Sequence, residues 1–221
     1  MFADIEALIF DVDGTLAETE EAHRLAFNDA FAEAGLDWDW TPDLYRELLK
    51  VTGGKERIGH YRSLSPTAIA ALHARKTVLY AARIGGGAVP LRPGIEALIA
   101  EARRRGVRLA IATTTSRPNI DALIGATLGP EGAGWFEAIA CGDDVAAKKP
   151  DPEVYHLALA TLGAPAAHAV AVEDSWNGVR AAKGAGLWVI ATPSLYSAAD
   201  DFSEADLVCD APDIAARLGW A

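Results

Sequence analysis

The chain has 221 residues, and its acidic side chains outnumber the basic ones by 31 to 20, giving a formal net charge of −11 and a pI near 4.9. Hydrophobic residues make up 51% of the chain and charged residues 23%, which is typical of a globular protein and excludes wholesale disorder. The acidic balance predicts no binding to nucleic acid or to an anionic membrane. The length suits one large α/β domain, or a core domain with a small second one.

Targeting and cysteine signals are weak. The sequence has no apolar run of roughly 18 residues, the length needed to span a bilayer. Its first residues lack the basic region and cleavage site of a signal peptide. Two cysteines, Cys141 and Cys209, are too few for a disulfide framework or a cysteine-rich zinc site. We therefore expect a cytoplasmic protein, a monomer, with no membrane partner.

Six short apolar runs predict the strands of a sheet, and several carry apolar residues on both faces, as strands do when helices cover both sides. The runs are Ile5–Phe10, Val107–Ala112, Ala138–Cys141, Ala169–Val172, Leu187–Ala191 and Leu207–Cys209. Helical stretches separate them at Gly94–Arg105, Ile120–Leu128, Glu153–Leu162, Gly178–Ala185 and Asp213–Leu218. This alternation predicts an α/β fold with a Rossmann-like, doubly wound parallel sheet.

One interval breaks the alternation. From Glu18 to Ala88 the sequence shows only helical periodicity, and its aromatic residues are expected to form a core rather than a base-stacking platform. These residues are Phe27, Phe31, Trp38, Trp40 and Tyr45. We therefore expect a helical insert at residues 17–90, including its hinge linkers, within a core formed by residues 1–16 and 91–221. The hinge connections are expected at 16–19 and 85–91.

The first predicted strand ends in Asp11-Val-Asp-Gly-Thr15. Two carboxylates one residue apart at a strand end can both face the mouth of an open α/β sheet, where ligands bind. Asp, Gly and Thr are also common in turns, so this pattern alone leaves an acidic turn as an alternative.

Hydroxyl groups follow the second strand, in the run Thr113-Thr-Thr-Ser116. Hydroxyls and free N–H groups at a helix start form a cradle for anions. A simple helix N-cap is the alternative, because Ser116 precedes Arg117-Pro118.

Two further charged pairs follow strands. Lys148 and Lys149 precede a helix, where the helix dipole disfavours positive charge, so a carboxylate or phosphate partner is expected. Glu173 and Asp174 end another apolar strand. Together with Asp11 and Asp13 they would form an oxygen cluster suited to Mg²⁺.

The order of these four motifs resembles that of the haloacid dehalogenase superfamily, in which the helical insert would be a C1 cap. Four segments look most like the CbbY-like sugar-phosphate phosphatases, a group that includes a xylulose-1,5-bisphosphate phosphatase. They are Asp11-Val-Asp-Gly-Thr-Leu-Ala-Glu-Thr-Glu, Thr52-Gly-Gly-Lys-Glu-Arg-Ile58, Thr113–Ser116, and Glu173-Asp-Ser-x-Asn-Gly-x-Arg-Ala-Ala-Lys-Gly-Ala-Gly186.

The resemblance implies an enzyme in which Asp11 attacks phosphorus to give an aspartyl-phosphate. Asp13 would act as general acid for the leaving group and then as base for the hydrolytic water. Such an acid needs a raised pKa or a proton gained on closure. Mg²⁺ would be held by Asp11, the Asp13 carbonyl and Asp174, with Glu173 nearby.

The remaining core roles follow from the same resemblance. Lys149 would neutralise the transferring phosphoryl oxygens, while Thr113 and the Thr114 N–H would position them. Lys148 is the weaker candidate for this role, and a merely solvated side chain is the alternative for it.

Residues of the insert are expected to select the substrate. His23 and Glu18 lie near the first hinge, and Glu18 is placed to accept hydrogen bonds from sugar hydroxyls. Lys76 could reach the closed site from a later helix. A structural histidine and an ordinary surface lysine are the alternatives.

A second phosphate could be held by Lys55 and Arg57 of the Thr-Gly-Gly-Lys loop, assisted by Thr115, Ser116 and Arg117 of the core. A surface position is the alternative for Arg57. The substrate expected from these features is a small phosphorylated sugar, with a pentulose bisphosphate as the best candidate. A β-phosphoglucomutase-like transferase, a phosphoglycolate phosphatase and a non-catalytic phosphate-binding protein remain as alternatives.

Overall fold

The computed structural model describes residues 5–87 and 89–220. Six parallel strands form one sheet in the order β3-β2-β1-β4-β5-β6. The strands are β1 (Ala7–Phe10), β2 (Arg108–Ala112), β3 (Phe136–Ala140), β4 (Ala169–Glu173), β5 (Trp188–Ala191) and β6 (Leu207–Val208). Because β1 lies between β2 and β4, the chain reverses its direction across the sheet at β1, where open α/β sheets bind ligands.

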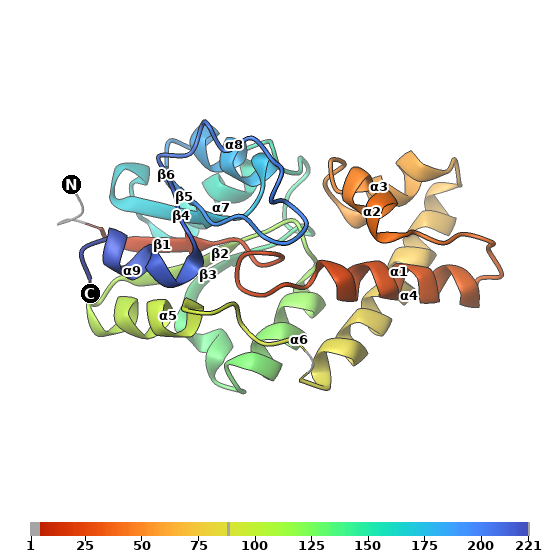
Figure 1. Ribbon diagram of the computed structural model, residues 1–221, viewed down its shortest axis with the longest axis horizontal. Helices are drawn as coiled ribbons and strands as arrows, with labels where there is room; N and C mark the ends of the chain where they lie inside the picture. The colour runs from red at the N-terminus through yellow and green to blue at the C-terminus, as the bar shows by residue number, and fades with distance from the viewer. Residues whose placement is uncertain (1–4, 88, 221) are drawn as a thin grey trace.

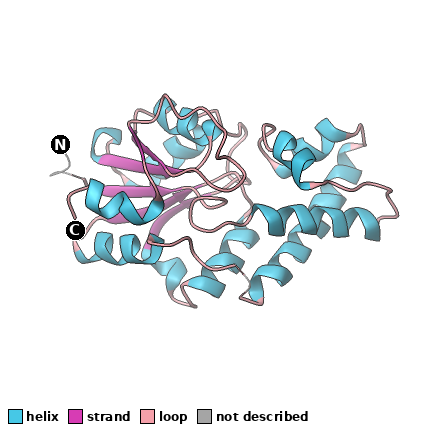
Figure 2. Cartoon of the chain, viewed as in Figure 1, coloured by secondary structure: helices cyan, strands magenta, loops and turns pink. Residues whose placement is uncertain are grey.

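Helices cover both faces of the sheet (Figure 2). Alternate strand residues point to opposite faces, so Leu8 and Phe10 pack towards one layer and Ala7 and Ile9 towards the other. The first layer contains α5 (Ile95–Arg104), α6 (Arg117–Thr127) and α9 (Ile214–Arg217), and the second contains α7 (Glu153–Leu162) and α8 (Trp176–Gly184). Short 3₁₀ turns are η1 (Gly132–Trp135), η2 (Ala166–His168) and η3 (Ala211–Asp213). The predicted doubly wound α/β fold is confirmed.

Four helices separate β1 from α5 and lie beside the sheet rather than on it (Figure 1). They are α1 (Glu20–Glu33), α2 (Pro42–Leu48), α3 (Gly54–Tyr61) and α4 (Pro66–Gly85). Thr41 and Ser65 cap α2 and α4 by accepting from backbone N–H groups three residues later, and each precedes a proline at the first helical position.

These helices enclose their own aromatic cluster. Phe27, Phe31, Trp40 and Tyr45 are fully buried there, and Trp38 packs against them, so the expected aromatic core is present. Helix α4 also contributes Tyr80 and Ile84 to the cluster of the sheet layer. The division into a core (1–16 and 91–221) and a cap (17–90) stays a prediction, and the separate hydrophobic clusters support it. We use the words core and cap in this sense.

The two connections between core and cap run side by side. Ala17 and Leu91 form an antiparallel bridge, and the Arg92 N–H donates to the Leu16 carbonyl at 2.8 Å. The predicted hinge segments therefore meet at one place.

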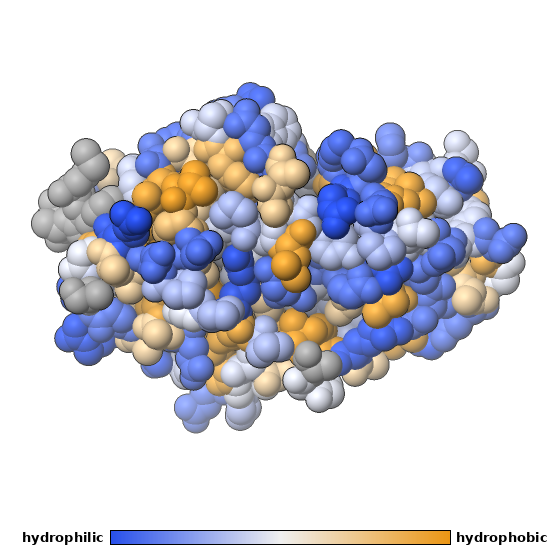
Figure 3. Space-filling view, in the orientation of Figure 1, coloured by the Kyte–Doolittle hydropathy of each residue, from blue (hydrophilic) through white to orange (hydrophobic). Residues whose placement is uncertain are grey.

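The main differences from the predicted elements are at their boundaries. Helix α6 begins at Arg117, three residues before the predicted start, because Pro118 favours the first helical turn. Ser116 occupies the N-cap position, but its side chain makes no capping hydrogen bond. Within the described residues, no helix is long and apolar enough to cross a membrane. On the face shown in Figure 3, hydrophobic residues form small separate groups.

Candidate active site

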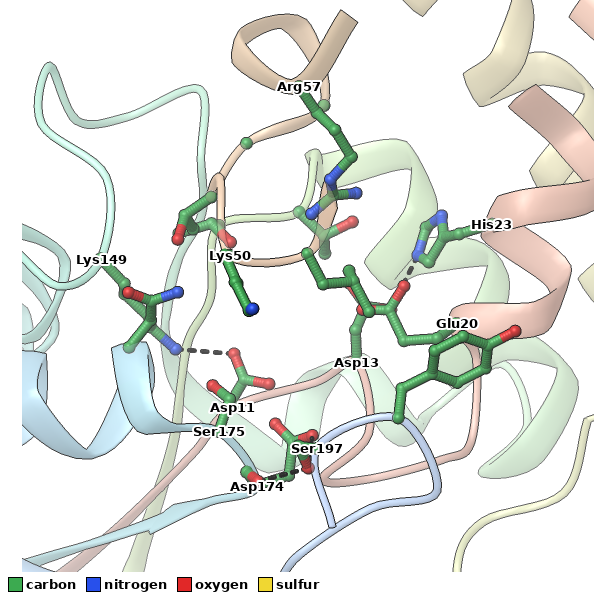
Figure 4. A pocket seen from close by; sticks show the side chains of 18 of the residues that line it. Asp11, Asp13, Glu20, His23, Lys50, Arg57, Lys149, Asp174, Ser175 and Ser197 are labelled. Carbon is green, nitrogen blue, oxygen red and sulfur yellow. Dashed lines mark hydrogen bonds and ion pairs between the residues drawn. The ribbon is translucent and has the colours of Figure 1, made fainter. Parts of the chain in front are cut away.

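A cavity of about 600 Å³ lies between the carboxyl ends of the strands and the cap. The core contributes residues that follow β1, β2, β3, β4 and β5, and the cap contributes α1, α2, α3 and α4 (Figure 4). Side chains lining it include Asp11, Asp13, Thr113, Thr114, Thr115, Ser116, Lys149 and Asp174 from the core, and Glu20, His23, Arg57, His73 and Lys76 from the cap.

Three buried carboxylates meet at the core end of this cavity. Asp11, Glu173 and Asp174 each place an oxygen within 4.8 Å of the others. Glu173 Oε1 accepts from Lys149 at 2.6 Å and Tyr155 at 2.5 Å, but its Oε2 is buried without a hydrogen-bond partner among the described residues. Carboxylate oxygens are the ligands preferred by Mg²⁺, so this set fits a hard divalent cation.

Lys149 balances part of this negative charge. Its Nζ donates to Asp11 and Glu173, each at 2.6 Å, and to the Ala112 carbonyl at 2.8 Å. Burial lowers the pKa of Lys149, but the two carboxylates outweigh burial and hold it above its usual value. Burial raises the pKa of Asp11 to about 7, although Lys149 opposes the shift. The carboxylate partner expected for a lysine before α7 is therefore present.

The neighbouring Lys148 is half-buried and is bound to loop carbonyls, so it is not merely solvated. Its Nζ donates to the Gly142 and Val145 carbonyls at 2.5 and 2.8 Å. These bonds satisfy two carbonyls of the loop after β3, which would otherwise need water as a partner. Lys148 thereby stabilises the conformation of this loop. Lys148 does not line the cavity.

Asp13 turns away from the other carboxylates and towards the cap (Figure 4). Its Oδ1 accepts from Thr19 Oγ1 at 2.6 Å and contacts His23 Nε2 at 2.8 Å. Lys76 Nζ lies 2.5 Å from His23 Nδ1. An ammonium group has no acceptor, so Nδ1 accepts from Lys76 and the proton on Nε2 is donated to Asp13.

This chain of contacts affects how Asp13 ionises. Burial raises the pKa of the Asp13 carboxyl, but its interactions with His23, Thr19 and Lys76 outweigh burial and hold the pKa below its usual value. Asp13 is therefore ionised in this arrangement. A catalytic acid at this position was expected to have a raised pKa or to gain a proton on closure. The pKa of Asp13 is lowered instead of raised.

Hydroxyls after β2 line the cavity beside the start of α6. Thr115 Oγ1 accepts from Asn119 Nδ2 at 2.9 Å, while Ser116 Oγ is buried without a hydrogen-bond partner among the described residues. Asn119 is 2% exposed and also lines the cavity, but sequence reasoning missed it. Its position three residues after Ser116, on the same helical face, was the available signal.

The cap residues expected to contact substrate divide into two groups. His23, Arg57 and Lys76 line the cavity. Arg57 is buried rather than a surface charge, and its guanidinium donates to the Leu48 carbonyl and the Tyr45 hydroxyl, both at 3.1 Å.

Glu18 and Lys55 lie outside the cavity. The Glu18 carboxylate contacts the Leu195 N–H and Arg92 instead. Glu20, at the start of α1, is the nearby glutamate that lines the cavity. Lys55 has a side chain that is 51% exposed and lies 3.9 Å from Asp143. These two positions could not be predicted, because the local sequence does not determine which side of a helix start faces the core.

Other lining residues were missed for the same reason. Lys50 follows α2, and His73 lies on α4 one turn before Lys76. Burial and the nearby positive charge of Lys76 lower the pKa of His73 to about 3, so its ring is neutral. None of these positions belongs to a recognisable motif.

A family model described as haloacid dehalogenase-like hydrolase matches residues 5–186. The chain belongs to this family of hydrolases. It is similar to the protein CbbY of Cereibacter sphaeroides, with 53% identity over 211 residues that cover 93% of this chain and 92% of that protein. It is also similar to CbbY of Rhodobacter capsulatus, with 54% identity over 208 residues that cover 92% of each chain.

Solved structures of CbbY proteins also resemble this chain in fold and sequence. The crystal structure of CbbY from Rhodobacter sphaeroides in complex with phosphate matches with a TM-score of 0.91 and 51% identity, covering 95% of this chain and 96% of that one. A mutant of that CbbY in complex with xylulose-(1,5)-bisphosphate matches with a TM-score of 0.89 and 52% identity, covering 93% of each. A β-phosphoglucomutase from Clostridium difficile, at 22% identity and a TM-score of 0.78, shares the fold alone.

These findings confirm three predictions. The chain resembles the CbbY-like proteins, its fold is that of this family, and it is an enzyme, a haloacid dehalogenase-type phosphatase. The roles of individual residues and the identity of the substrate are developed as proposals below.

Proposed function

We propose that the chain is a Mg²⁺-dependent phosphatase that hydrolyses a small sugar phosphate or bisphosphate through an aspartyl-phosphate. Xylulose-1,5-bisphosphate is the substrate we favour. The observation that carries the proposal is the placement of Asp11 and Asp13 in one cavity with different partners. Asp11 lies among Lys149 and the other carboxylates, whereas Asp13 contacts the cap. The complex of a similar CbbY with this bisphosphate supports the choice of substrate.

Asp11 is the proposed nucleophile, and a carboxylate that approaches an anionic phosphoryl group needs positive charge beside it. Asp11, Asp174, Glu173 and the Asp13 carbonyl would hold Mg²⁺, which supplies electrostatic stabilisation of the phosphoryl oxygens when bound. Lys149 lies 2.6 Å from Asp11 and can donate to the same oxygens. Thr113 and the Thr114 N–H line the cavity at the end of β2 and orient the group in transfer.

Asp13 is the proposed general acid and base. Because it is ionised in this arrangement, it is ready to accept the proton of the hydrolytic water, and it needs a proton before it can protonate the leaving alkoxide. The His23 Nε2–H is 2.8 Å from its carboxylate, and Lys76 fixes the tautomer from the other side. The cap thereby orients the proton-transferring group of the core.

A second phosphate would occupy the cap side of the cavity. Arg57 provides a buried guanidinium there, and Thr115, Ser116 and Asn119 provide polar groups at the start of α6. Arginine and a helix N-terminus both favour anions. Two anion-binding ends in one cavity fit a short bisphosphate better than a monophosphate.

The test is phosphate release from a panel of sugar phosphates that includes xylulose-1,5-bisphosphate and phosphoglycolate, with Mg²⁺ and with a chelator. We expect release to require Mg²⁺ and to fall by at least about 1,000-fold in Asp11→Asn, because the nucleophile is lost. Asp37→Asn, an exposed carboxylate of the same type, is the control and keeps full activity.

Three results would contradict the proposal. They are the absence of release from every sugar phosphate, full activity in Asp11→Asn, and isomerised sugar phosphate in NMR spectra without net phosphate release. The last result would identify a mutase. The cytoplasmic location and monomeric state expected from the sequence stay predictions.

A further inference from the structure

The segment Ser194–Ser197 follows β5 and lies between the acidic cluster and the cap. The blue part of the chain after β5 extends towards the cap in Figure 1. Two of its residues contact Asp174, and two contact cap residues or the hinge. No role in the reaction proposed above has been given to any of its side chains.

On the core side, the two serines surround the Asp174 side chain. Ser194 Oγ donates to Asp174 Oδ2 at 2.7 Å, and Ser197 Oγ lies 2.6 Å from the Asp174 carbonyl and 3.1 Å from Oδ2. The Ser194 N–H donates to Ser197 Oγ at 2.9 Å, which closes a small ring of contacts. Figure 4 shows the contact between Ser197 and Asp174. With both hydroxyls buried, Asp174 has little freedom to rotate.

Gly14 crowds the same Asp174 oxygen that the serines contact. A Cβ on Gly14, whose φ is +84°, would lie 2.2 Å from Asp174 Oδ2 and 3.0 Å from Ser194 Oγ. The backbone after Asp13 therefore packs directly against this carboxylate, and only glycine permits that approach. Gly14 and the two serines thus surround one carboxylate oxygen of Asp174, and we expect a displacement of the segment to move that carboxylate.

On the cap side, Tyr196 is the main contact. Its hydroxyl donates to Glu21 Oε2 at 2.6 Å, and its ring packs edge-on against Tyr45 with centroids 5.8 Å apart. The Arg46 guanidinium lies 5.4 Å from the ring centroid. Glu21 belongs to α1 and the other two residues to α2, so one core side chain contacts two cap helices.

The hinge completes the connection. The Leu195 N–H donates to the Glu18 carboxylate at 3.3 Å, and Glu18 lies 3.4 Å from Arg92 Nε. The Arg92 guanidinium donates to the carbonyls of Gly14 at 2.5 Å and of Thr192 and Pro193 at 2.8 Å. The start of the segment is thus bound to Glu18 of the first hinge connection and to Arg92, which directly follows the second.

We propose that Ser194–Ser197 is a coupling segment in which the serines position Asp174 for the divalent cation and Tyr196 engages the cap, so that cation binding and cap closure favour each other. The proposal rests on the proposed function, because it takes Asp174 as a cation ligand. It makes Ser194, Tyr196 and Ser197 positioning residues. Reciprocity is required by thermodynamics, since a cap position that stabilises Asp174 must itself be stabilised when a cation binds there.

The experiment measures binding of Mg²⁺ alone by calorimetry, without substrate. Outer partners of a metal ligand typically change metal affinity 10- to 100-fold, so we expect about tenfold weaker binding in Ser197→Ala. Tyr196→Phe removes only the hydroxyl contact, and Glu21→Ala removes its partner in the cap. Substitutions along a coupled network shift affinity by about 2- to 30-fold, and we expect a loss of roughly threefold in both.

Matched controls separate these effects from changes of charge or composition. Glu33→Ala removes the same residue type from the same helix, but Glu33 pairs with Arg75 on the cap surface. Ser203→Ala removes an exposed serine later in the same loop. Both should bind Mg²⁺ like the unmodified protein. Thermal unfolding of each variant checks that it is folded. If Glu21→Ala unfolds the cap, Tyr196→Phe still tests the coupling, because it keeps the ring contacts of Tyr196.

The outcomes distinguish this proposal from the proposed function. Unchanged Mg²⁺ affinity in Ser197→Ala overturns the positioning role, and unchanged affinity in both Tyr196→Phe and Glu21→Ala overturns the coupling. If the unmodified protein binds no Mg²⁺, both proposals fail. If the expected order of affinities is found but no sugar phosphate is hydrolysed, only the proposed function fails.

Discussion

Two buried lysines face the same cavity from opposite sides, and their surroundings differ. Lys149, in the core, lies 2.6 Å from each of two carboxylates, which hold its pKa above the usual value against the opposing effect of burial. Lys76, in the cap, has no carboxylate within ion-pair distance among the described residues. Burial lowers its pKa to about 7, and its near neighbours are His23 and the rings of Phe27 and Tyr80.

The difference indicates that the core side of the site is electrostatically balanced without a ligand, whereas the cap side is not. The core lysine is compensated before any ligand arrives, so we expect it to contribute to stability as well as to the proposed reaction. The cap lysine has no carboxylate in direct contact among the described residues, so burying its charge is costly unless an anion binds beside it. An anionic substrate would supply that missing charge, so the cap is arranged to be completed by its ligand.

The largest effect is expected from Lys149→Met. It should lower kcat/KM by about 100- to 1,000-fold, because a donor to the transferring oxygens is lost. It should also lower the free energy of unfolding by about 3–5 kcal/mol, since Asp11 and Glu173 are left buried without their cation. Kinetics and urea unfolding measure the two losses.

Lys148→Met is the matched control for this prediction, because the adjacent lysine only holds loop carbonyls. It should lower kcat/KM much less than Lys149→Met. Equal losses of activity in the two variants would contradict the proposal that Lys149, and not Lys148, binds the transferring phosphoryl oxygens.

Lys76→Met should change stability in the opposite direction. The lysine is charged in both folded and unfolded chains below pH 7, so the full cost of burying its charge is present there. As pH rises from about 7 towards 10.5, the unfolded chain binds more protons at this residue than the folded one, and the cost disappears. The variant should therefore be more stable by about 1–4 kcal/mol at pH 6, with a gain that shrinks towards pH 10.

The same variant should lose about tenfold in kcat/KM, because His23 loses the contact that fixes its tautomer. Urea unfolding across pH 6–10 and kinetics at pH 7 test both parts. A loss of stability at pH 6, or a gain that does not depend on pH, would show that Lys76 is compensated after all.

The smallest effect concerns two exposed lysines of the cap. Lys50 lines the cavity, and Lys55 does not. Exposed charges contribute about 0.2–1 kcal/mol, so Lys50→Ala should raise KM by up to about fivefold with little change in kcat, and Lys55→Ala should change KM by less than about 1.5-fold. A larger effect at Lys55 would show that the loop carrying it contacts the substrate, as its sequence suggested.

Much of the core could be predicted because its signals are local. Each strand is a short apolar run, and each chemistry-bearing residue follows such a run directly, as Asp11, Thr113 and Glu173 do. Parallel strands bring their carboxyl ends to one edge, so knowing the strands is nearly enough to bring these residues together. Lys149 does not follow a strand directly, and the loop between β3 and α7 brings it back to the same edge.

The cap was predicted as a helical unit with an aromatic core, but its contacts with the site were predicted less well. Glu18 and Lys55 lie outside the cavity, whereas Glu20, Lys50 and His73 line it. A helix places residues around its whole circumference, and which face meets the core depends on how the cap is oriented. No local pattern encodes that orientation.

The sequence by itself determined the doubly wound sheet, the helical insert, and the acidic and basic groups at the strand ends, because these follow from hydrophobic periodicity and strand order. Tertiary structure alone decided that Asp13 faces His23 and Lys76 rather than the acidic cluster, and that Ser194–Ser197 joins Asp174 to the cap. These contacts join residues that are far apart in the chain, such as Glu21 and Tyr196. They depend on how two separately packed units meet, which the local sequence does not specify.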